Sequence, residues 1–224
     1  MKVEIWSDIM CPFCYIGKRK FESALNSLPE KDSIEVVWHS FQLNPNLQYQ
    51  PGKDAYTYLA EIKGQTHEWS VQVHQSLIET AKNVGLDYNF ETTKITNSFD
   101  AHRVIQLAKK YNLTNEIEER FFSAYFIEGE LMSDHATLIR LATEAGLATD
   151  EVTQVLESNQ YAEEVKNDCA EAKKMGANGV PFFVMDRKYT MYGTQDTSVF
   201  LKTIQKAFYE WKNNKPLRPT FRMA

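Results

Sequence analysis

The feature that most constrains the fold of this chain is where its strand-like segments lie. They occur only near the two ends of the sequence. Residues 2–6 alternate apolar and polar side chains, a period of two that predicts a half-buried strand. Residues 34–41 predict a second strand, and residues 182–185 and 188–192 predict a hairpin. The two ends of the chain are therefore expected to share one sheet.

Between these strands the apolar residues recur every three or four positions, which is typical of amphipathic helices. A first helix is predicted to follow the first strand and to end at Pro29, and a last one to surround Phe200 and Trp211. The remaining predicted helices form the middle of the chain and lie near residues 53–62, 67–84, 99–111, 114–128, 133–145, 149–157 and 160–175.

This order of elements predicts an α/β protein, with one sheet domain interrupted by an all-helical insertion. The sheet domain is expected to combine residues 1–50 and 165–212, and the insertion to cover residues 51–164. Residues 213–224 are expected to form a solvated C-terminal tail. With 224 residues, of which 43% are hydrophobic, the chain is long enough to bury a substantial core.

The charge and the apolar stretches exclude several classes of partner. The net charge is −5, and there is no basic stripe of the kind that a nucleic-acid backbone requires. No apolar run is long enough to span a bilayer. Glu4 and Asp8 interrupt the N-terminal segment, so no secretory signal is predicted there. We therefore expect a cytoplasmic protein that binds neither nucleic acid nor membrane, and the sequence leaves its oligomeric state open.

The strongest chemical signal is Cys11-Pro12-Phe13-Cys14, directly after the first strand. Proline suits the first position of a helix, so Cys11 is expected at the N-cap and Cys14 in the first turn. The N-terminus of a helix favours an anion, which predicts a lowered pKa and an accessible thiolate for Cys11. Cys14 should be more buried and less ionised. Thiol–disulfide exchange would then use Cys11 as the attacking sulfur and Cys14 as the resolving one.

Two alternatives for this pair are half of a zinc site and inert packing. Structural zinc needs four ligands, but only one other cysteine, Cys169, is present. His67 and His74 stand seven positions apart and form no compact ligand pair. Redox chemistry is therefore preferred, with no metal and no cofactor beyond the redox-active disulfide. Cys169 is expected to be a buried or half-buried free thiol in a helix.

A second signal is Gly179-Val180-Pro181-Phe182 at the start of the third predicted strand. Proline is tolerated at the first residue of a strand, and a cis bond before it would be a purposeful feature. Beside the two cysteines, such a loop would leave the backbone of Val180 free to pair with an extended peptide. Val180, Pro181 and Phe13 are therefore the predicted substrate-binding residues. Phe13 cannot stabilise a thiolate as histidine would. We therefore expect the Cys11–Cys14 dithiol–disulfide couple to be less oxidising than one with histidine at this position.

Three histidines attract attention but are expected in structural positions. His39 follows a predicted strand and is the one that could approach the cysteine pair, although a structural placement is preferred. His102 lies near the start of a predicted helix, where Asp100 is expected to act as a cap. For His135 we also predict a structural position.

Together, these motifs resemble the DsbA-like thioredoxin-fold oxidoreductases, and within them the FrnE-like branch of dithiol–disulfide isomerases. The resemblance rests on the residues from Cys11 to Gly17 and on those from Gly179 to Phe183. The stretches from Phe41 to Pro45 and from Asn97 to Arg103 support it, and it extends over about residues 2–210.

The resemblance implies a thioredoxin-like fold with an inserted all-helical domain and a cis bond at Val180–Pro181. It also implies catalysis through Cys11 and Cys14 on protein or small-molecule thiols and disulfides, with glutathione as a possible co-substrate. A second interpretation is a glutathione-dependent enzyme of the 2-hydroxychromene-2-carboxylate isomerase or kappa-class transferase type, although those proteins typically carry serine at the position of Cys11. A third is a non-catalytic peptide-binding module.

Overall fold

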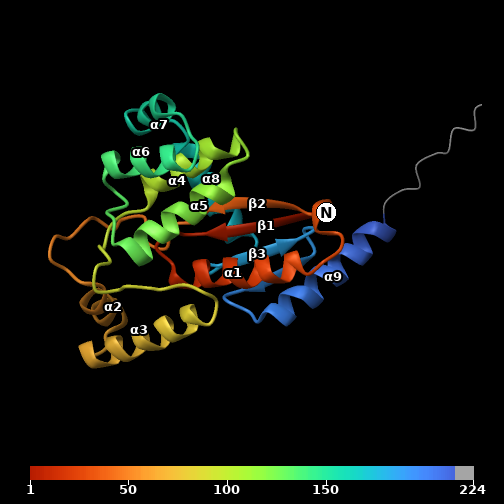
Figure 1. Ribbon diagram of the computed structural model, residues 1–224, viewed down its shortest axis with the longest axis horizontal. Coiled ribbons are helices and arrows are strands. Elements are labelled where there is room, and N and C mark those ends of the chain that lie inside the picture. The colour runs from red at the N-terminus through yellow and green to blue at the C-terminus, as the bar shows by residue number, and fades with distance from the viewer. Residues whose placement is uncertain (215–224) are drawn as a thin grey trace, which may run out of the picture.

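The computed structural model describes residues 1–214 and places the strands from both ends of the chain in one mixed sheet (Figure 1). The four strands lie in the order β2-β1-β3-β4. β1 (Lys2–Ser7) pairs in parallel with β2 (Glu35–Ser40) and antiparallel with β3 (Phe182–Met185). β4 (Tyr189–Tyr192) completes the predicted hairpin with β3. Of the predicted tail over residues 213–224, all but the first two residues lie outside the described part.

Two helices cover one face of this sheet. They are α1 (Pro12–Asn26) and α9 (Thr197–Asn213), which lie side by side along the strands in Figure 1. Residues that alternate along the strands, such as Ile5 and Phe183, point into a core shared with Phe200 of α9. The intervening residues of the strands point to the other face, as the period of two predicts. A short 3-10 turn, Lys31–Ser33 (η1), leads from α1 into β2.

The helical insertion follows β2, and most of its helices lie beyond one end of the sheet in Figure 1. Its last helix packs on the sheet face opposite α1 and α9, where Ala172 joins Trp6 and Phe182 in a buried cluster. Its helices are α2 (Ala55–Lys63), α3 (His67–Lys82), α4 (Phe99–Lys109), α5 (Thr114–Ser123), α6 (His135–Glu144), α7 (Thr149–Leu156) and α8 (Ala162–Lys174). α5 continues into a π-helical turn, Ala124–Glu128 (η2). All seven predicted helices of the insertion are confirmed to within a few residues, and so is the fold class. The exact domain boundaries stay a prediction.

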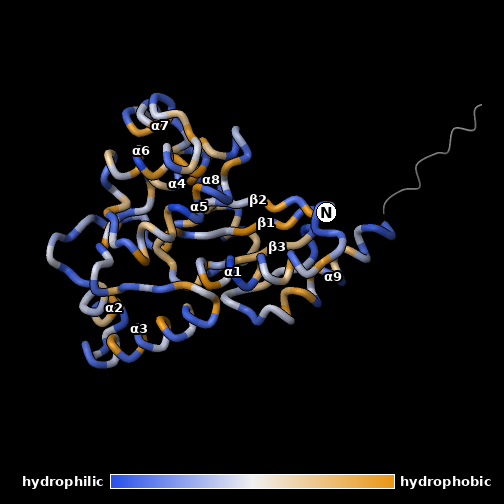
Figure 2. The backbone as a smooth tube through the Cα atoms, viewed as in Figure 1, coloured by the Kyte–Doolittle hydropathy of each residue, from blue (hydrophilic) through white to orange (hydrophobic). Residues whose placement is uncertain are grey.

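The insertion packs directly against the helix that carries the cysteines. Ile9, Tyr15 and Ile16 belong to the same buried cluster as Phe122 of α5. The ring of Tyr15 stacks on that of Phe122 with a centroid distance of 4.9 Å. Figure 2 shows hydrophobic and hydrophilic residues in alternating bands along α3 and α9, as expected for helices with one buried face. Among residues 1–214, no helix combines the length and apolar character needed to cross a bilayer.

Candidate active site

The first turn of α1 places the two cysteines as the sequence predicts. Cys11 is the N-cap residue, with an extended backbone (φ −94°, ψ 111°), and Pro12 opens the helix. The Cys11 amide donates to the carbonyl of Asp8 at 2.9 Å, and the Cys14 amide donates to the carbonyl of Cys11 at 3.0 Å. These bonds fix the turn that leads from β1 into the helix, so both side chains project from one short, rigid segment.

Within that turn Cys14 lies three residues after Cys11, on the first turn of the helix that Cys11 caps. Burial raises the pKa of Cys14 well above its usual range, and the interaction with Cys11 raises it further. Cys14 is 1% exposed, so the prediction of a buried thiol is confirmed. Cys11 is only 3% exposed, which corrects the prediction of an accessible sulfur at the surface. The neighbouring loops and the insertion cover it, and it is reached from a cavity instead.

The predicted proline loop closes the other side of Cys11. The Val180–Pro181 bond is cis, as the resemblance implies. The Cys11 thiol donates to the carbonyl of Val180 at 3.4 Å. That carbonyl has a second lone pair, and pairing of the Val180 backbone with a peptide stays a prediction. Pro181 is buried against Gly17, where an added Cβ would lie 3.2 Å from the proline Cγ. The absence of a side chain at Gly17 thus allows α1 to approach this loop closely.

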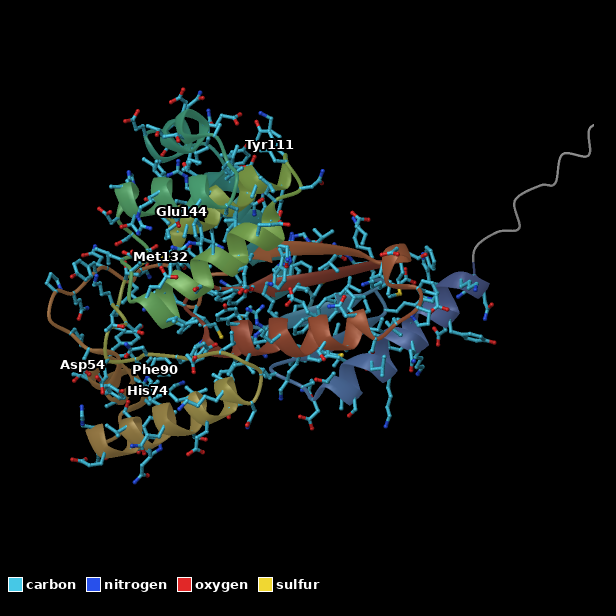
Figure 3. All side chains as sticks on the ribbon, viewed as in Figure 1. Asp54, His74, Phe90, Tyr111, Met132 and Glu144 are labelled. Carbon is cyan, nitrogen blue, oxygen red and sulfur yellow. The ribbon has the colours of Figure 1, made fainter. Side chains whose placement is uncertain are left out.

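Beside Cys11 lies a cavity of about 590 Å³ between α1, the loop after β2, and α2 and α3 of the insertion. Phe13 and Val180, two of the three predicted substrate-binding residues, line it, and Phe13 is also 46% exposed. On the α3 side, His74 and Phe90 lie together, with ring centroids 4.5 Å apart (Figure 3). Most of the lining is apolar, including Leu43, Leu47, Tyr58, Leu59, Ile62, Trp69, Val73, Leu77, Tyr125 and Phe126.

Two side chains that the sequence analysis missed hold the backbone of the motif. The Tyr88 hydroxyl, from the loop after α3, donates to the carbonyl of Pro12 at 2.7 Å. The Thr194 hydroxyl, from the segment after β4, donates to the carbonyl of Phe13 at 2.9 Å. Both bonds span long sequence separations, and no local pattern marks either residue.

The polar groups behind the cysteines centre on Asp8. Its carboxylate accepts from the amides of Met10 at 3.2 Å and Leu43 at 2.8 Å, tying the cysteine loop to the loop after β2. The fully buried His102 of α4 lies behind it, with Nε2 3.4 Å from Asp8 Oδ1. Asp100 does not cap this helix as predicted, because Ser98 is the N-cap residue and Asp100 already lies inside the first turn. Asp100 instead binds His135 at 2.9 Å, which gives that histidine the structural position predicted for it.

His39 belongs to a separate polar cluster and does not line the cavity. Its Nδ1 lies 2.9 Å from Asp168 of α8, and its ring stacks on Trp6 at 4.3 Å. The preferred structural placement is thus confirmed. Asp168 also binds Lys109 at 3.2 Å, so a protein cation already neutralises this carboxylate. Cys169 is half-buried in α8, as predicted, and donates to the carbonyl of a β2 residue.

Comparisons with known proteins agree with this geometry. The chain is 28% identical over 206 residues to the uncharacterized protein YwbO of Bacillus subtilis (strain 168), covering 90% of this chain and 94% of that protein. The crystal structure of the probable DsbA oxidoreductase SCO1869 from Streptomyces coelicolor is 37% identical, with a TM-score of 0.89 over 97% of this chain and 93% of that one. The cytosolic disulfide reductase DsbM from Pseudomonas aeruginosa shares the fold at 14% identity, with a TM-score of 0.62 and coverages of 95% and 98%.

The family comparison covers nearly the entire chain. The family model described as the DSBA-like thioredoxin domain matches residues 2–205. These residues include the cysteine turn, the whole insertion and the cis-proline loop. The match therefore extends to the elements that form the cavity as well as to the sheet. This protein belongs to the family of the DSBA-like thioredoxin domain.

Proposed function

We propose that this protein is a thiol–disulfide oxidoreductase or isomerase that works by dithiol–disulfide exchange through Cys11 and Cys14. The observation that carries the proposal is that Cys11 caps the start of α1 and lines the cavity, with Cys14 buried in the first turn of the same helix. Cys11 faces the cavity, whereas Cys14 lies behind it. This arrangement gives one sulfur access to substrate and keeps the second one ready to displace it.

In the reducing direction, the Cys11 thiolate attacks a substrate disulfide and forms a mixed disulfide with one substrate sulfur, while the other leaves as a thiolate. Cys14 then loses its proton and attacks Cys11. The Cys11–Cys14 bond forms, and the bond between Cys11 and the substrate breaks. The substrate gains two electrons and the cysteine pair loses two. The oxidising direction follows the same steps in reverse. The raised pKa of Cys14 keeps that thiol protonated until the mixed disulfide has formed.

The cavity supports a preference for substrates with apolar groups beside the reacting sulfur. Its walls are mostly aliphatic and aromatic, whereas charged side chains, such as Lys63, are few. Burial of apolar surface contributes about 25 cal/mol per Å². A peptide with large apolar residues next to its cysteine would therefore bind better than a polar one. Glutathione as a co-substrate, the FrnE-like branch and the cytoplasmic location remain predictions.

Reduction of insulin and reactivation of scrambled ribonuclease test the proposal. We expect Cys11→Ser to abolish both activities and Cys14→Ser to accumulate the mixed disulfide, which mass spectrometry detects. Cys169→Ser is the matched control, because Cys169 lies in a different cluster, and it should retain both activities. Full activity in Cys11→Ser would contradict the proposal.

A second candidate function is glutathione-dependent isomerisation or transfer on a small aromatic substrate. The observation that favours it is the size and apolar lining of the cavity beside Cys11. A 2-hydroxychromene-2-carboxylate isomerase structure shares the fold at 15% identity, with a TM-score of 0.63. Isomerisation of such a substrate with glutathione, retained in both Cys11→Ser and Cys14→Ser, would establish this function in place of disulfide exchange.

A further inference from the structure

β2 forms one edge of the sheet in the described part of the chain, because β1 pairs with it on one side and no strand pairs with it on the other (Figure 1). The hydrogen bonds show which of its backbone groups face the open side. The amides of Glu35 and Phe41 donate to carbonyls at either end of β1, at 2.8 and 2.9 Å. Since backbone groups alternate in direction along a strand, those of Val36, Trp38 and Ser40 point away from β1.

Helix α8 covers one end of this open side. The Ser40 amide donates to the carboxylate of Asp168 at 2.9 Å, and the Ser40 carbonyl accepts from the Cys169 thiol at 3.7 Å. Towards the start of β2 a groove of about 550 Å³ lies along the strand instead, and Val36 and Trp38 line it. An open strand edge of this kind is a template for pairing with a further extended segment.

We call this space the edge groove, and two other elements form its walls. One wall is α1, with Phe21 and Leu25, and the other is the connection from α4 to the start of α5, with Asn112 and Asn115. Because the strand lies between the walls, a single extended segment can reach its backbone. The sheet edge of a second copy of this chain would meet the walls first. The groove therefore favours a peptide segment as its occupant.

The side chains of the groove favour apolar residues at every second position of such a segment. Val36 and Trp38 point to the face of the sheet that α1 covers, where they pack in one apolar cluster with Phe21 and Leu25. Side chains of a paired strand that point the same way would extend this apolar surface, whereas the intervening side chains would lie on the other face.

The charges of the groove favour basic residues at the remaining positions. Glu35 is exposed and pairs only loosely with Lys2, 3.9 Å away. The other two charged residues of the lining have closer partners, because Lys109 binds Asp168 at 3.2 Å and Glu22 binds a lysine of its own helix. The carboxylate of Glu35 is therefore the charge left to attract a partner, and it attracts cations.

We propose that the edge groove binds an extended segment of a partner protein in which apolar and basic residues alternate. The segment pairs with β2 through the outward backbone groups of Val36 and Trp38 and adds a strand to the sheet. This site is separate from the proposed redox site, because none of its lining residues lines the cavity beside Cys11. Along the axis of α1, Phe21 lies about 15 Å from Cys11. A partner can thus occupy the groove while the cavity stays open to substrate.

Fluorescence anisotropy of fluorescein-labelled Thr-Lys-Val-Arg-Val-Lys-Thr amide with the full-length protein tests the proposal, and we expect saturable binding. Val36→Pro removes the outward N–H of that residue but none of the bonds that Glu35 and Phe41 make to β1. It should weaken binding about tenfold, since the peptide loses a backbone hydrogen bond and meets the proline ring. Val36→Ala is the matched control, because it shortens the side chain and keeps the N–H, and it should weaken binding far less.

Glu35→Gln tests the charge of the groove. It should weaken binding about threefold at low ionic strength, and the difference should become smaller at high salt because ions screen an exposed charge. Glu157→Gln is its control, because Glu157 is exposed at the end of α7 and does not line the groove.

Two modified peptides test the backbone pairing without any change to the protein, in case Val36→Pro does not fold. One is N-methylated at both valines and the other at the lysines and the arginine, so each lacks one alternating set of amide hydrogens. Only one set can face β2, and we expect only the peptide that lacks that set to lose binding, by about tenfold.

The proposal fails if the unmodified protein does not bind the peptide, if Val36→Pro binds it as tightly, or if the two N-methylated peptides bind equally. A dimer in analytical ultracentrifugation that Val36→Pro dissociates would instead assign the edge to a second copy of this chain. Tighter peptide binding after removal of residues 215–224 would assign the groove to that segment. Disulfide exchange through Cys11 and Cys14 stands or falls separately from all of these results.

Discussion

At the scale of single residues, Gly17 decides how closely the cysteine helix approaches the proline loop. A Cβ at this position would lie 3.2 Å from Pro181 Cγ and 3.6 Å from the ring of Phe183. The first of these distances is tighter than ordinary van der Waals contact, so a larger side chain must push the helix or the loop aside. Either movement alters the position of Cys11 relative to Val180.

We therefore expect Gly17→Val to lower the free energy of unfolding by about 1–3 kcal/mol and to slow the reaction of Cys11 with disulfides. Urea denaturation and stopped-flow thiol titration measure the two effects. Gly179→Ala is the control, because an added Cβ there meets no atom within 4 Å. Unchanged stability and unchanged thiol reactivity in Gly17→Val would show that this contact does not position the site.

At the scale of elements, α5 is joined to α1 by a charged cluster centred on Glu119. Its carboxylate accepts from the Tyr15 hydroxyl at 2.6 Å, from Lys18 at 2.9 Å, and from Arg19. Burial alone would raise the pKa of Glu119. The hydrogen bonds from Arg19 and the charge of Lys18 outweigh burial and lower that pKa to about 2. The ionised carboxylate thus stabilises the contact between the insertion and the cysteine helix.

A carboxyl whose pKa is lower in the folded state stabilises the fold above its unfolded pKa. The contribution of Glu119 should be complete above about pH 5 and lost as the pH falls towards 2. We expect Glu119→Gln to reduce stability at pH 7 by about 1–2 kcal/mol, since its side chain is 33% exposed and solvent screens the pairs.

The difference in the free energy of unfolding between Glu119→Gln and the unmodified protein should become smaller below pH 4. Urea denaturation at several pH values measures this difference. Glu163→Gln is the control, because Glu163 pairs with Lys166 on an exposed surface and should contribute little. A difference in stability that does not vary with pH would contradict the electrostatic explanation.

At the scale of the whole molecule, the helices α4 and α2 of the insertion differ in how many of their residues are buried. Eight of the eleven residues of α4 are buried, whereas only Ala55 and Ala60 are buried among the nine of α2. In Figure 1, α2 and α3 stand apart from the other helices of the insertion. Helices with few buried apolar contacts open at lower free energy than those in the core.

We predict that the amides of α2 exchange with deuterium faster than those of α4, by at least tenfold at pH 7 and 25 °C. Hydrogen-exchange mass spectrometry of the reduced protein measures both segments in one experiment. A substrate or inhibitor bound in the cavity should slow exchange in α2 and leave α4 nearly unchanged. Equal rates of amide exchange in α2 and α4 would contradict the prediction that α2 opens more readily than α4.

Much of this architecture follows from the sequence. Cys11 and Val180 are far apart in the chain, yet both were predicted at the site, because each belongs to a recognisable motif beside a predicted strand. The antiparallel pairing of β1 with β3 is what brings the two motifs together. Periodicity also located the helices. It could not show which residue of the acidic run Glu118-Glu119 faces the interior, because that depends on the packing of α5 against α1 and α4. Apart from Phe13 and Val180, the residues that line the cavity were missed for the same reason, since they come from separate elements.

The indole of Trp69 lines the cavity beside Cys11, whereas Trp6 and Trp38 are sealed within the sheet domain. The protein therefore carries an optical reporter at the place where substrate is proposed to enter. A molecule that fills the cavity replaces water around that indole and shifts its emission. Trp6, Trp38 and the half-buried Trp211 of α9 lie outside the cavity lining and supply a constant background. Ligand screening on this protein thus needs no attached dye.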